Sequence, residues 1–455
     1  MQSMLINLYF INLLNPSRQR LDLGFPHASA PSLLRPPLPH AESCAPGSGV
    51  SEAYLKAREA AELLGVKLPT LYAYVSRGQL TSVPGPGRAK RYRRADLEAL
   101  RLRRGGARAR EGSAQPSPLR WGEPVLDSSI TEVVPGGHRY RGQSAIELAE
   151  QDTRFEDVAE LLWTGSLPPE PAHWPRAELP LLFADPSLRS ALGPDARAED
   201  APPLARLALL IPALALGDPA RYGNAPAALL PRGRALIRAM AEALGGLGDP
   251  DLSVAECLAH GLCPRRKATA AQAFNRGLVL WADHELNVSS FAARVAASAG
   301  ADLYSCVSAG LAALSGPRHG GACDQIEALL EEIRRPERAD EVLNERARRG
   351  EILPGFDHPL YPEGDPRALP LLETATELGG ARVRLVEALV KAQRARGHEP
   401  TVDVGFVALC AGLKLRPGSA PGLVAVGRAA GWIAHVAEQH EAGFLIRPRA
   451  RYRSR

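Results

Sequence analysis

Seven polar side chains in the second half of the chain have types and settings that would suit acid–base chemistry on a dicarboxylic acid. Each lies in a Gly/Pro-marked stretch or near a predicted helix end, and the seven are His284, His319, His358, Asp403, Arg367, Arg428 and Arg447. Arginine binds a carboxylate through two parallel hydrogen bonds. Histidine can polarise a carbonyl group, and aspartate can move a proton. The set therefore predicts a pocket in which an anionic dicarboxylate is bound and a proton is transferred.

Each of these residues also has a structural explanation when it is taken alone. His319 lies in GPRHGG, where it could be an incidental surface histidine at a helix end, and His284 could cap a helix. Asp403 could be an acidic residue stabilising the first turn of a helix. Arg447 could be one of many exposed basic residues. The combination of all seven favours a functional site over these separate explanations.

The elements that would position these residues are predicted to be helices. From about residue 120 onward the chain consists of Ala/Leu-rich segments with helical spacing, broken by proline and glycine. No alternation of strands and helices is apparent, and neither a GxGxxG nor a Walker motif is present. We therefore expect an all-α body, and the whole chain to be mainly α.

The motifs of this body resemble the citrate synthase family over roughly residues 125–455. The resemblance is carried by HELNVSSFAAR, GPRHGGA, GFDHPLYPEGDPRA, TVD, GRAAGWIAH and LIRPR, in the order of the family, together with SSITEVVPGGHRYRGQSAIELAEQ nearer the N-terminus. It implies a citrate synthase-like pair of helical domains. The large domain would be residues 121–319 and 406–455, and the small domain would be residues 320–405. Closure of the small domain on the large one would keep water out until both substrates are bound.

The resemblance also implies a role for each site residue. His319 would hold the thioester carbonyl of acetyl-CoA, Asp403 would remove a methyl proton, and His358 would polarise the ketone of oxaloacetate. Oxaloacetate would be bound by His284, His358, Arg367, Arg428 and Arg447. Arg447 would be contributed across the interface of a homodimer.

An aspartate is too weak a base to abstract a carbon-bound proton unless the enolate is stabilised as it forms. We expect His319 to supply that stabilisation as a neutral imidazole, which donates one N–H to the developing oxygen while its other nitrogen is fixed by backbone. Gly320 and Gly321 would begin a helix whose positive end favours this arrangement, and would clear room for the CoA thioester.

The function implied is that of citrate synthase, an acyltransferase of the tricarboxylic acid cycle that condenses acetyl-CoA with oxaloacetate and water to citrate and CoA. The expectation includes acetyl-CoA as a substrate, no cofactor and no metal. A 2-methylcitrate synthase using propionyl-CoA is an alternative, because one methylene in an acyl pocket is a small energetic distinction. A DNA-binding regulator whose synthase-like body senses metabolites is a second alternative.

Three departures from the family pattern bear on CoA binding. Asp357 stands where the family usually has glycine before the catalytic histidine, and it adds a negative charge where the polyanionic CoA should approach. Pro362 stands where many members have Lys or Arg, and Cys323 stands where Asn is usual. These changes predict weak affinity for acetyl-CoA with the chemistry retained.

A small basic module precedes the body. Residues 51–120 hold 15 Lys/Arg and 6 Asp/Glu, whereas the whole chain has a net charge of only +5. Two short predicted helices joined by a Gly-containing turn, followed by a basic Gly/Pro-rich turn, resemble the winged helix-turn-helix of excisionase and MerR-type regulators. This predicts a DNA-binding domain over residues 51–105, with a basic hairpin for protein contact as the alternative. The DNA-binding candidates are Thr70, Tyr72, Arg77, Arg88, Arg91 and Arg93.

The remaining segments give few functional signals. Residues 1–50 are expected to be a disordered extension or the result of a start codon placed too early, and residues 106–120 to be a flexible linker. The apolar stretch at residues 4–14 is too short for a membrane span and lacks signal-peptide flanks. The six cysteines show no metal-binding spacing, so we expect free thiols and a cytoplasmic protein without membrane contact.

Overall fold

The computed structural model describes most of the chain from residue 54 onward. The described residues are 54–63, 66, 68–76, 80, 82–84, 90–93, 97, 126–134, 136–174, 176, 202–450 and 452. The chain divides into two compact units, Met1–Glu123 and Pro124–Arg455. The predicted segments 1–50 and 106–120 lie outside the described residues.

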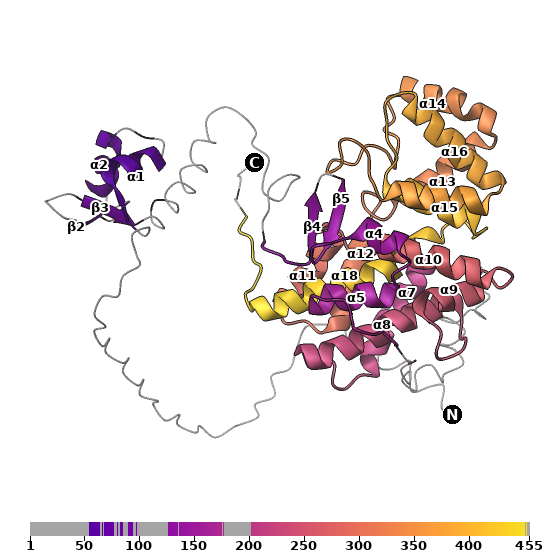
Figure 1. Cartoon of the computed structure of the whole chain (residues 1–455), viewed down its shortest axis with the longest axis horizontal. Helices are drawn as coiled ribbons and strands as arrows, with labels where there is room; N and C mark the ends of the chain where they lie inside the picture. The colour runs from indigo at the N-terminus through magenta and orange to yellow at the C-terminus, as the bar shows by residue number, and fades with distance from the viewer. Residues whose placement is uncertain are drawn as a thin grey trace, which may run out of the picture. The chain divides into compact units, whose positions relative to one another are not determined.

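Among its described residues, the first unit has two short helices and a three-stranded antiparallel sheet (Figure 1). Its elements are β1 (Tyr54–Lys56), α1 (Ala57–Leu63), α2 (Leu68–Ser76), β2 (Ser82–Pro84) and β3 (Lys90–Arg93). The strand order is β1-β3-β2, so the β2–β3 pair stands where the wing was predicted. Buried Ala60, Leu71 and Tyr92 join the helices to the sheet in one small core. The winged helix-turn-helix fold is thereby confirmed.

The second unit begins with a small antiparallel sheet, so the expectation of an all-α body was wrong. Its strands are β4 (Thr131–Val134), β5 (Gly137–Tyr140) and β6 (Gln143–Ser144), paired in the order β4-β5-β6. Val134 pairs with Gly137, and both Gly136 and Gly137 have positive φ angles, which suit the tight turn between the strands. The runs are only two to four residues long, too short for a periodic signal in the sequence.

The rest of the second unit is helical, as predicted. Its helices are α4 (Ala145–Glu150), α5 (Phe155–Thr164), α7 (Pro203–Leu216), α8 (Pro226–Gly245), α9 (Val254–Leu262), α10 (Lys267–Trp281), α11 (Val288–Ser298), α12 (Leu303–Leu314), α13 (Ala322–Ile333), η3 (Pro336–Arg338), α14 (Ala339–Arg348), α15 (Ala368–Leu378), α16 (Ala381–Arg394), α17 (Val402–Gly412) and α18 (Ala420–Ala442). Helix α18 is buried along most of its length and contacts α5, α8, α10, α11 and α12, so it forms the central element of the core.

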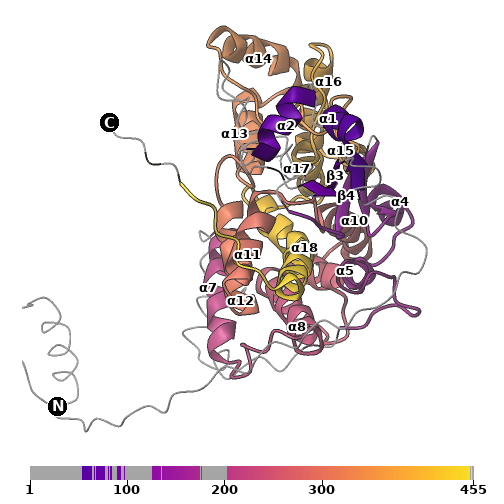
Figure 2. The same cartoon turned by 90° about the vertical axis from the view of Figure 1, so that its left-hand side faces the viewer.

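Helices α13, α14 and α16 gather at one end of this unit, while α5, α8 and α18 lie toward the other (Figures 1 and 2). Helix α17 packs mainly on α15, with further contacts to α13 and α16. The division into large and small domains stays a prediction, and its proposed boundary at residue 405 falls inside α17.

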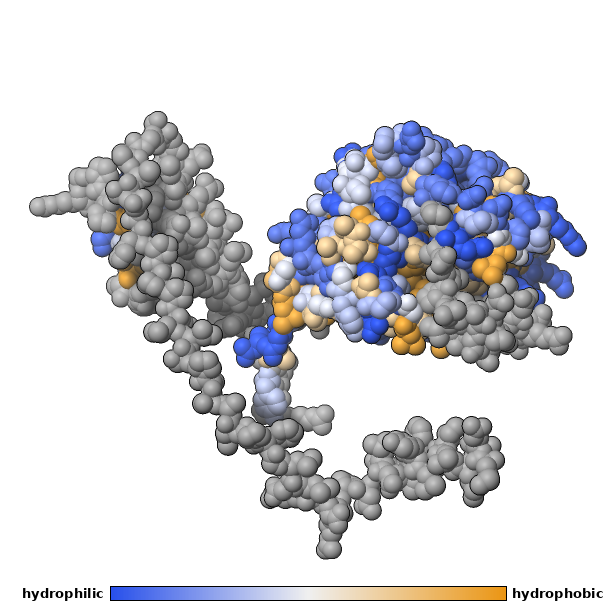
Figure 3. All heavy atoms as spheres, turned by 90° about the horizontal axis from the view of Figure 1, so that it is seen from below, coloured by the Kyte–Doolittle hydropathy of each residue, from blue (hydrophilic) through white to orange (hydrophobic). Residues whose placement is uncertain are grey.

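The surface of the second unit is mostly hydrophilic on the face shown in Figure 3, with scattered hydrophobic patches. Among the described helices, none combines the length and the apolar character that crossing a bilayer requires.

Candidate active site

Three histidines from different parts of the second unit form a cluster, in which His138 and His284 are buried and His358 is half-buried. The ring of His284, which follows α10, lies 5.5 Å from that of His138 on β5 and 5.3 Å from that of His358 in the loop before α15. The Nε2 atom of His284 is 2.8 Å from the Tyr361 hydroxyl, and the rings of His358 and Tyr361 are 5.0 Å apart. Helix α11 is capped by the Asn287 side chain, so His284 is not the capping residue.

Burial keeps these histidines neutral. It lowers the pKa of His358 to about 4, with help from the neighbouring Arg367, and it lowers the pKa of His138 to about 3. The pKa of His284 also lies well below the ordinary value, because of burial and then Arg367. Leu360 N–H donates to His358 Nδ1 at 3.2 Å, which leaves the proton of a neutral ring on Nε2. His358 can thus act as a hydrogen-bond donor without carrying a charge.

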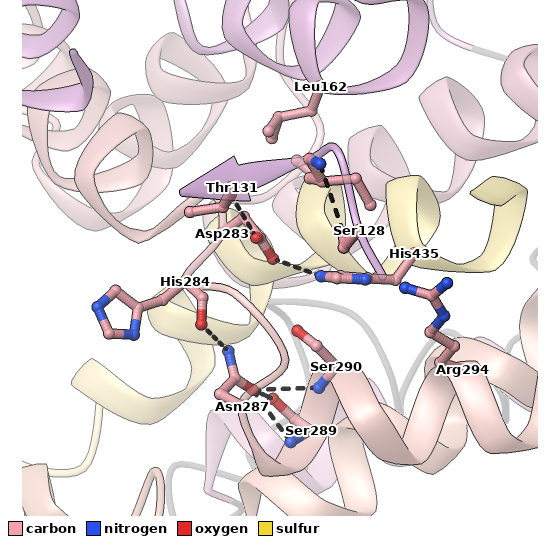
Figure 4. A network of polar contacts seen from close by, with 12 residues as sticks. Ser128, Thr131, Leu162, Asp283, His284, Asn287, Ser289, Ser290, Arg294 and His435 are labelled. Atoms are coloured by element: carbon pink, nitrogen blue, oxygen red, sulfur yellow. Dashed lines mark hydrogen bonds and ion pairs between the residues drawn. The ribbon is translucent and has the colours of Figure 1, made fainter. Parts of the chain in front are cut away.

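His319 is fixed by a serine hydroxyl, whereas we had expected backbone. Its Nε2 atom lies 2.8 Å from Ser289 Oγ, in the first turn of α11. The same hydroxyl is 2.8 Å from Asn287 Oδ1, which also accepts from the backbone N–H groups of Ser289 and Ser290 (Figure 4). Burial, followed by the charge of Arg428, lowers the pKa of His319 to about 4. His319 is therefore a neutral ring, as predicted.

The glycines after His319 are required by the packing of their own turn. A Cβ atom on Gly320 would lie 2.5 Å from the Leu314 carbonyl oxygen, and one on Gly321 would lie 2.7 Å from Pro317 Cα. The chain folds back on the end of α12 here, and α13 then begins at Ala322. These close approaches, which the sequence alone did not reveal, explain both glycines without reference to a ligand.

Asp403 lies in the first turn of α17 and is half-buried. Its Oδ2 atom accepts a hydrogen bond from Thr401 Oγ1 at 2.9 Å, and its Oδ1 atom is 3.9 Å from Cys323 Sγ, on α13. Burial raises the pKa of Asp403, while Thr401 and Arg367 oppose that shift. A carboxylate with a raised pKa is a stronger proton acceptor than an exposed one. The position is also that of a helix-stabilising acid, so both interpretations given above apply to it.

Two buried arginines flank these groups. Arg367 is 2% exposed and is bound by both oxygens of Asp365, at 2.8 Å from Nε and 2.7 Å from Nη2. Arg428, on α18, is also 2% exposed, and its guanidinium carbon lies 5.2 Å from the centre of the Trp281 ring. Within the described part of the chain, its Nε and Nη1 atoms have no hydrogen-bond partner. Because buried donors are normally satisfied, Arg428 points to an anionic ligand.

The electrostatic contacts bring six of the seven predicted residues together. Arg428 lowers the pKa values of His284 and His319, and Arg367 lowers those of His284, His358 and Asp403. Arg447 is the exception, because it is exposed in the tail after α18 and has no hydrogen bond or ion pair to another described residue.

A buried polar network supports the His284 backbone. Asp283 accepts a hydrogen bond from Thr131 at 2.6 Å and lies 3.5 Å from His435 on α18, with both Asp283 and His435 fully buried (Figure 4). The Tyr140 hydroxyl donates to the Asp283 carbonyl at 3.2 Å and lies 2.9 Å from His138 Nε2. Sequence reasoning missed these residues, as it missed Tyr361 and Asp365. The available signal for His138 was its place in SSITEVVPGGHRYRGQSAIELAEQ, a stretch that resembles the family.

A cleft of about 1020 Å³ opens beside Tyr361 and Asp365, between the β4–β5 hairpin and the loop that precedes α15. Its lining includes four glutamates, which are Glu132, Glu285, Glu363 and Glu399. Arg394, the basic residue in the lining, is paired with Glu399 at 3.0 Å. The cleft is therefore an acidic approach to the site, although His319 and Asp403 do not line it.

The described cysteines agree with the expectation of free thiols. The five described cysteines are all free and buried, while Cys44 lies outside the described residues. No cluster of three or more His, Cys, Asp or Glu side chains able to hold a metal ion occurs among the residues that the structure describes.

Only part of the predicted DNA-contact set falls on described residues of the first unit. Tyr72 on α2 is 49% exposed, Thr70 is half-buried, and Arg91 and Arg93 lie on β3. Arg77 and Arg88 lie outside the described residues.

Comparison with known proteins agrees with both parts of this description. Residues 119–449 match the family "Citrate synthase, C-terminal domain", and residues 54–105 match "Helix-turn-helix domain". The chain belongs to the citrate synthase family. The enzyme class is therefore an acyltransferase of the citrate synthase type, whose members use acetyl-CoA as a substrate and need no cofactor, as the resemblance had implied.

Similar proteins include some that are named citrate synthase and some that are named 2-methylcitrate synthase. Citrate synthase 2 of Bacillus subtilis (strain 168) is 30% identical over 353 residues, which are 71% of this chain and 92% of that protein. 2-Methylcitrate synthase 2 of Corynebacterium glutamicum is 28% identical over 352 residues, which are 71% of this chain and 91% of that protein. The citrate synthase structure from Thermotoga maritima MSB8 superposes with a TM-score of 0.60 at 25% identity, over 73% of this chain and 94% of that one.

Proposed function

We propose that the protein condenses acetyl-CoA with oxaloacetate and water to give citrate and CoA. The observation that carries this proposal is the buried Arg428 guanidinium, whose Nε and Nη1 have no partner within the described part of the chain. It lies among neutral histidines and a half-buried aspartate, and an anionic ketodiacid would satisfy it.

In this proposal Asp403 removes a proton from the acetyl methyl group while His319 donates a hydrogen bond to the thioester oxygen. For His319 Nδ1 to be the donor, the unprotonated Nε2 must accept a hydrogen bond from the Ser289 hydroxyl. Asn287 Oδ1 already accepts two backbone N–H groups, so the serine hydroxyl can turn toward the histidine. Neutral His319 then stabilises the enolate as negative charge develops on its oxygen.

The enolate carbon then attacks the ketone of oxaloacetate. His358 donates a hydrogen bond from Nε2 to the ketone oxygen, and His284, Arg367 and Arg428 bind the substrate through its carboxylates and ketone. The new carbon–carbon bond gives citryl-CoA, and water hydrolyses its thioester to release citrate and CoA. Arg447 would complete the oxaloacetate site from the other subunit of a homodimer, in keeping with its exposure and its lack of a hydrogen bond or ion pair to another described residue.

The alternative is a 2-methylcitrate synthase that uses propionyl-CoA, which the Corynebacterium relative's name supports. A thiol-release assay with both acyl-CoA substrates and oxaloacetate, on wild type and on Asp403→Ala, tests the two readings. We expect turnover in wild type and a fall of about 100-fold or more in the variant. Preference for propionyl-CoA would support the alternative, and no turnover with either substrate would contradict the enzyme proposal and favour a metabolite sensor.

We also propose that the first unit binds double-stranded DNA through residues 51–105. The helix-turn-helix match and the exposed Tyr72 on α2 support this function. A gel shift with the upstream promoter should show binding that weakens steeply as salt rises. Tyr72→Ala should weaken DNA binding. DNA binding that changes neither with salt nor with this substitution would favour the alternative of a hairpin for protein contact.

A further inference from the structure

The residue before His358 has a backbone conformation that non-glycine residues rarely adopt. Asp357 has a φ angle of 58°, in the left-handed region. Glycine would enter this region freely, whereas aspartate is among the few other residues that tolerate it. Strain at one residue persists when surrounding contacts determine the conformation, so the contacts of Asp357 are informative.

The backbone on both sides of Asp357 pairs with the segment that leads into α17. Asp357 N–H donates to the Glu399 carbonyl at 2.9 Å, and Thr401 N–H donates to the Gly355 carbonyl at 2.8 Å. These two bonds make Phe356 and Pro400 an isolated antiparallel bridge. The loop that carries His358 is thus joined to the residues that immediately precede Asp403.

The Asp357 side chain completes this junction. In a regular antiparallel pair, the Asp357 carbonyl would accept the Glu399 N–H group. The left-handed turn directs the backbone toward His358 instead, and Asp357 Oδ1 accepts that N–H at 3.1 Å. Asp357 Oδ2 lies 2.5 Å from His398 Nδ1. A glycine at this position would make neither contact.

We propose that Asp357 and His398 are positioning residues that fix the His358 loop against the start of α17 and so set His358 relative to Asp403. This inference rests on the function proposed above, in which His358 acts on the ketone of oxaloacetate and Asp403 acts on the acetyl group of acetyl-CoA. It gives Asp357 a different role from that expected from the sequence, where its charge was predicted to weaken CoA binding.

The two roles differ in the kinetic constant that they control. A misplaced histidine slows the reaction and lowers kcat, whereas removal of a repelling charge strengthens substrate binding and lowers KM. Both side chains of the pair are about half exposed, with 54% for Asp357 and 47% for His398, so each contact makes a modest contribution.

The test measures kcat and both KM values for Asp357→Gly, Asp357→Asn and His398→Ala. We expect kcat to fall about fivefold in Asp357→Gly and about threefold in His398→Ala, with each KM within about twofold of wild type. Asp357→Asn should stay within about twofold of wild-type kcat, because asparagine also tolerates the left-handed region and keeps an acceptor for Glu399 N–H. His173→Ala is the matched control, since His173 and Asp251 form another exposed pair, 3.6 Å apart, and its kinetics should be unchanged.

Amide hydrogen exchange supplies a readout that does not depend on turnover. Exchange at residues 398–401 should be faster in Asp357→Gly than in wild type, and unchanged there in His173→Ala. A sharp fall in the KM for acetyl-CoA at constant kcat, or unchanged exchange in Asp357→Gly, would overturn the positioning role. If exchange is faster in Asp357→Gly but the wild-type protein shows no turnover, the contact between the His358 loop and the start of α17 is supported and the proposed reaction is rejected.

Discussion

The N-terminal end of α15 and the middle of α18 each place a buried arginine beside the candidate site, and the two differ in their partners. Arg367 is held by both oxygens of Asp365. Burial alone would lower its pKa, but Asp365 outweighs burial and raises it. Arg428 has two nitrogens without a partner in the described chain, and burial lowers its pKa. The charge of Arg367 is thus largely balanced by Asp365 inside the fold, whereas Arg428 keeps two nitrogens for a ligand.

The largest expected effect comes from breaking the paired arginine. Arg367→Met leaves Asp365, a carboxylate that is 4% exposed, without its cation. Removing one partner of a buried pair costs about 3–5 kcal/mol, so the free energy of unfolding should fall by that amount. Urea unfolding followed by circular dichroism measures it. A loss below about 1 kcal/mol would contradict the structural role of the pair.

Arg428→Met should show the opposite pattern. The substitution removes a buried charge whose Nε and Nη1 lack a hydrogen-bond partner among the described residues, so the free energy of unfolding should be equal to or higher than that of wild type. The KM for oxaloacetate should rise about 100-fold, because charged hydrogen bonds to a carboxylate are lost. The two measurements must be made on one preparation. Lower stability with unchanged KM would mean that Arg428, like Arg367, serves the fold.

The Ser289 hydroxyl offers a test with a smaller expected effect. It contacts His319, whose pKa is lowered by burial and then by Arg428. Ser289→Ala removes the partner of His319 Nε2, so the proton of the ring is no longer directed to Nδ1. We expect kcat to fall about tenfold with little change in the KM for oxaloacetate. Ser290→Ala is the neighbouring control. Equal losses in both variants would indicate damage to α11 and not to His319.

The raised pKa of Asp403, which burial causes and the charge of Arg367 opposes, predicts how kcat/KM depends on pH. The reaction needs ionised Asp403, so kcat/KM should fall as pH decreases through its raised pKa, while His319 and His358 stay neutral down to about pH 4. The acidic limb of the pH profile should therefore include the titration of Asp403, and a substitution beside Asp403 tests this assignment. Cys323→Ser places a stronger donor near Oδ1 and should move that limb to lower pH. A limb at the same pH in both proteins would show that residue 323 does not influence the base.

Local motifs were enough to select six residues that the structure places near one another, because each lies in a short stretch that resembles the family. His138, Tyr361 and Asp365 were missed because their roles depend on partners that the fold supplies. Tyr361, for example, meets His284 across 77 positions of sequence. The β4–β6 sheet was missed for a different reason, since strands of two to four residues give no usable alternation.

The motif GPRHGG contains both a correct prediction and an incorrect one. The neutral state of His319 and the helix that begins at Ala322 were predicted correctly. The reason for the two glycines was not predicted, because it depends on close approaches to Leu314 and Pro317. The group that fixes the His319 ring was not predicted either, because Ser289 is brought near only by the fold.

Helix α18 also has a consequence for the order in which this enzyme is made. It supplies Arg428, and its Gly431 fits against Asp283 so closely that a Cβ atom would lie 2.2 Å from Asp283 Oδ1. It follows every other helix of the site in the chain. A ribosome-bound nascent chain therefore lacks Arg428 in its pocket until this helix emerges, so catalysis should not begin before residues up to Ala442 have left the ribosome.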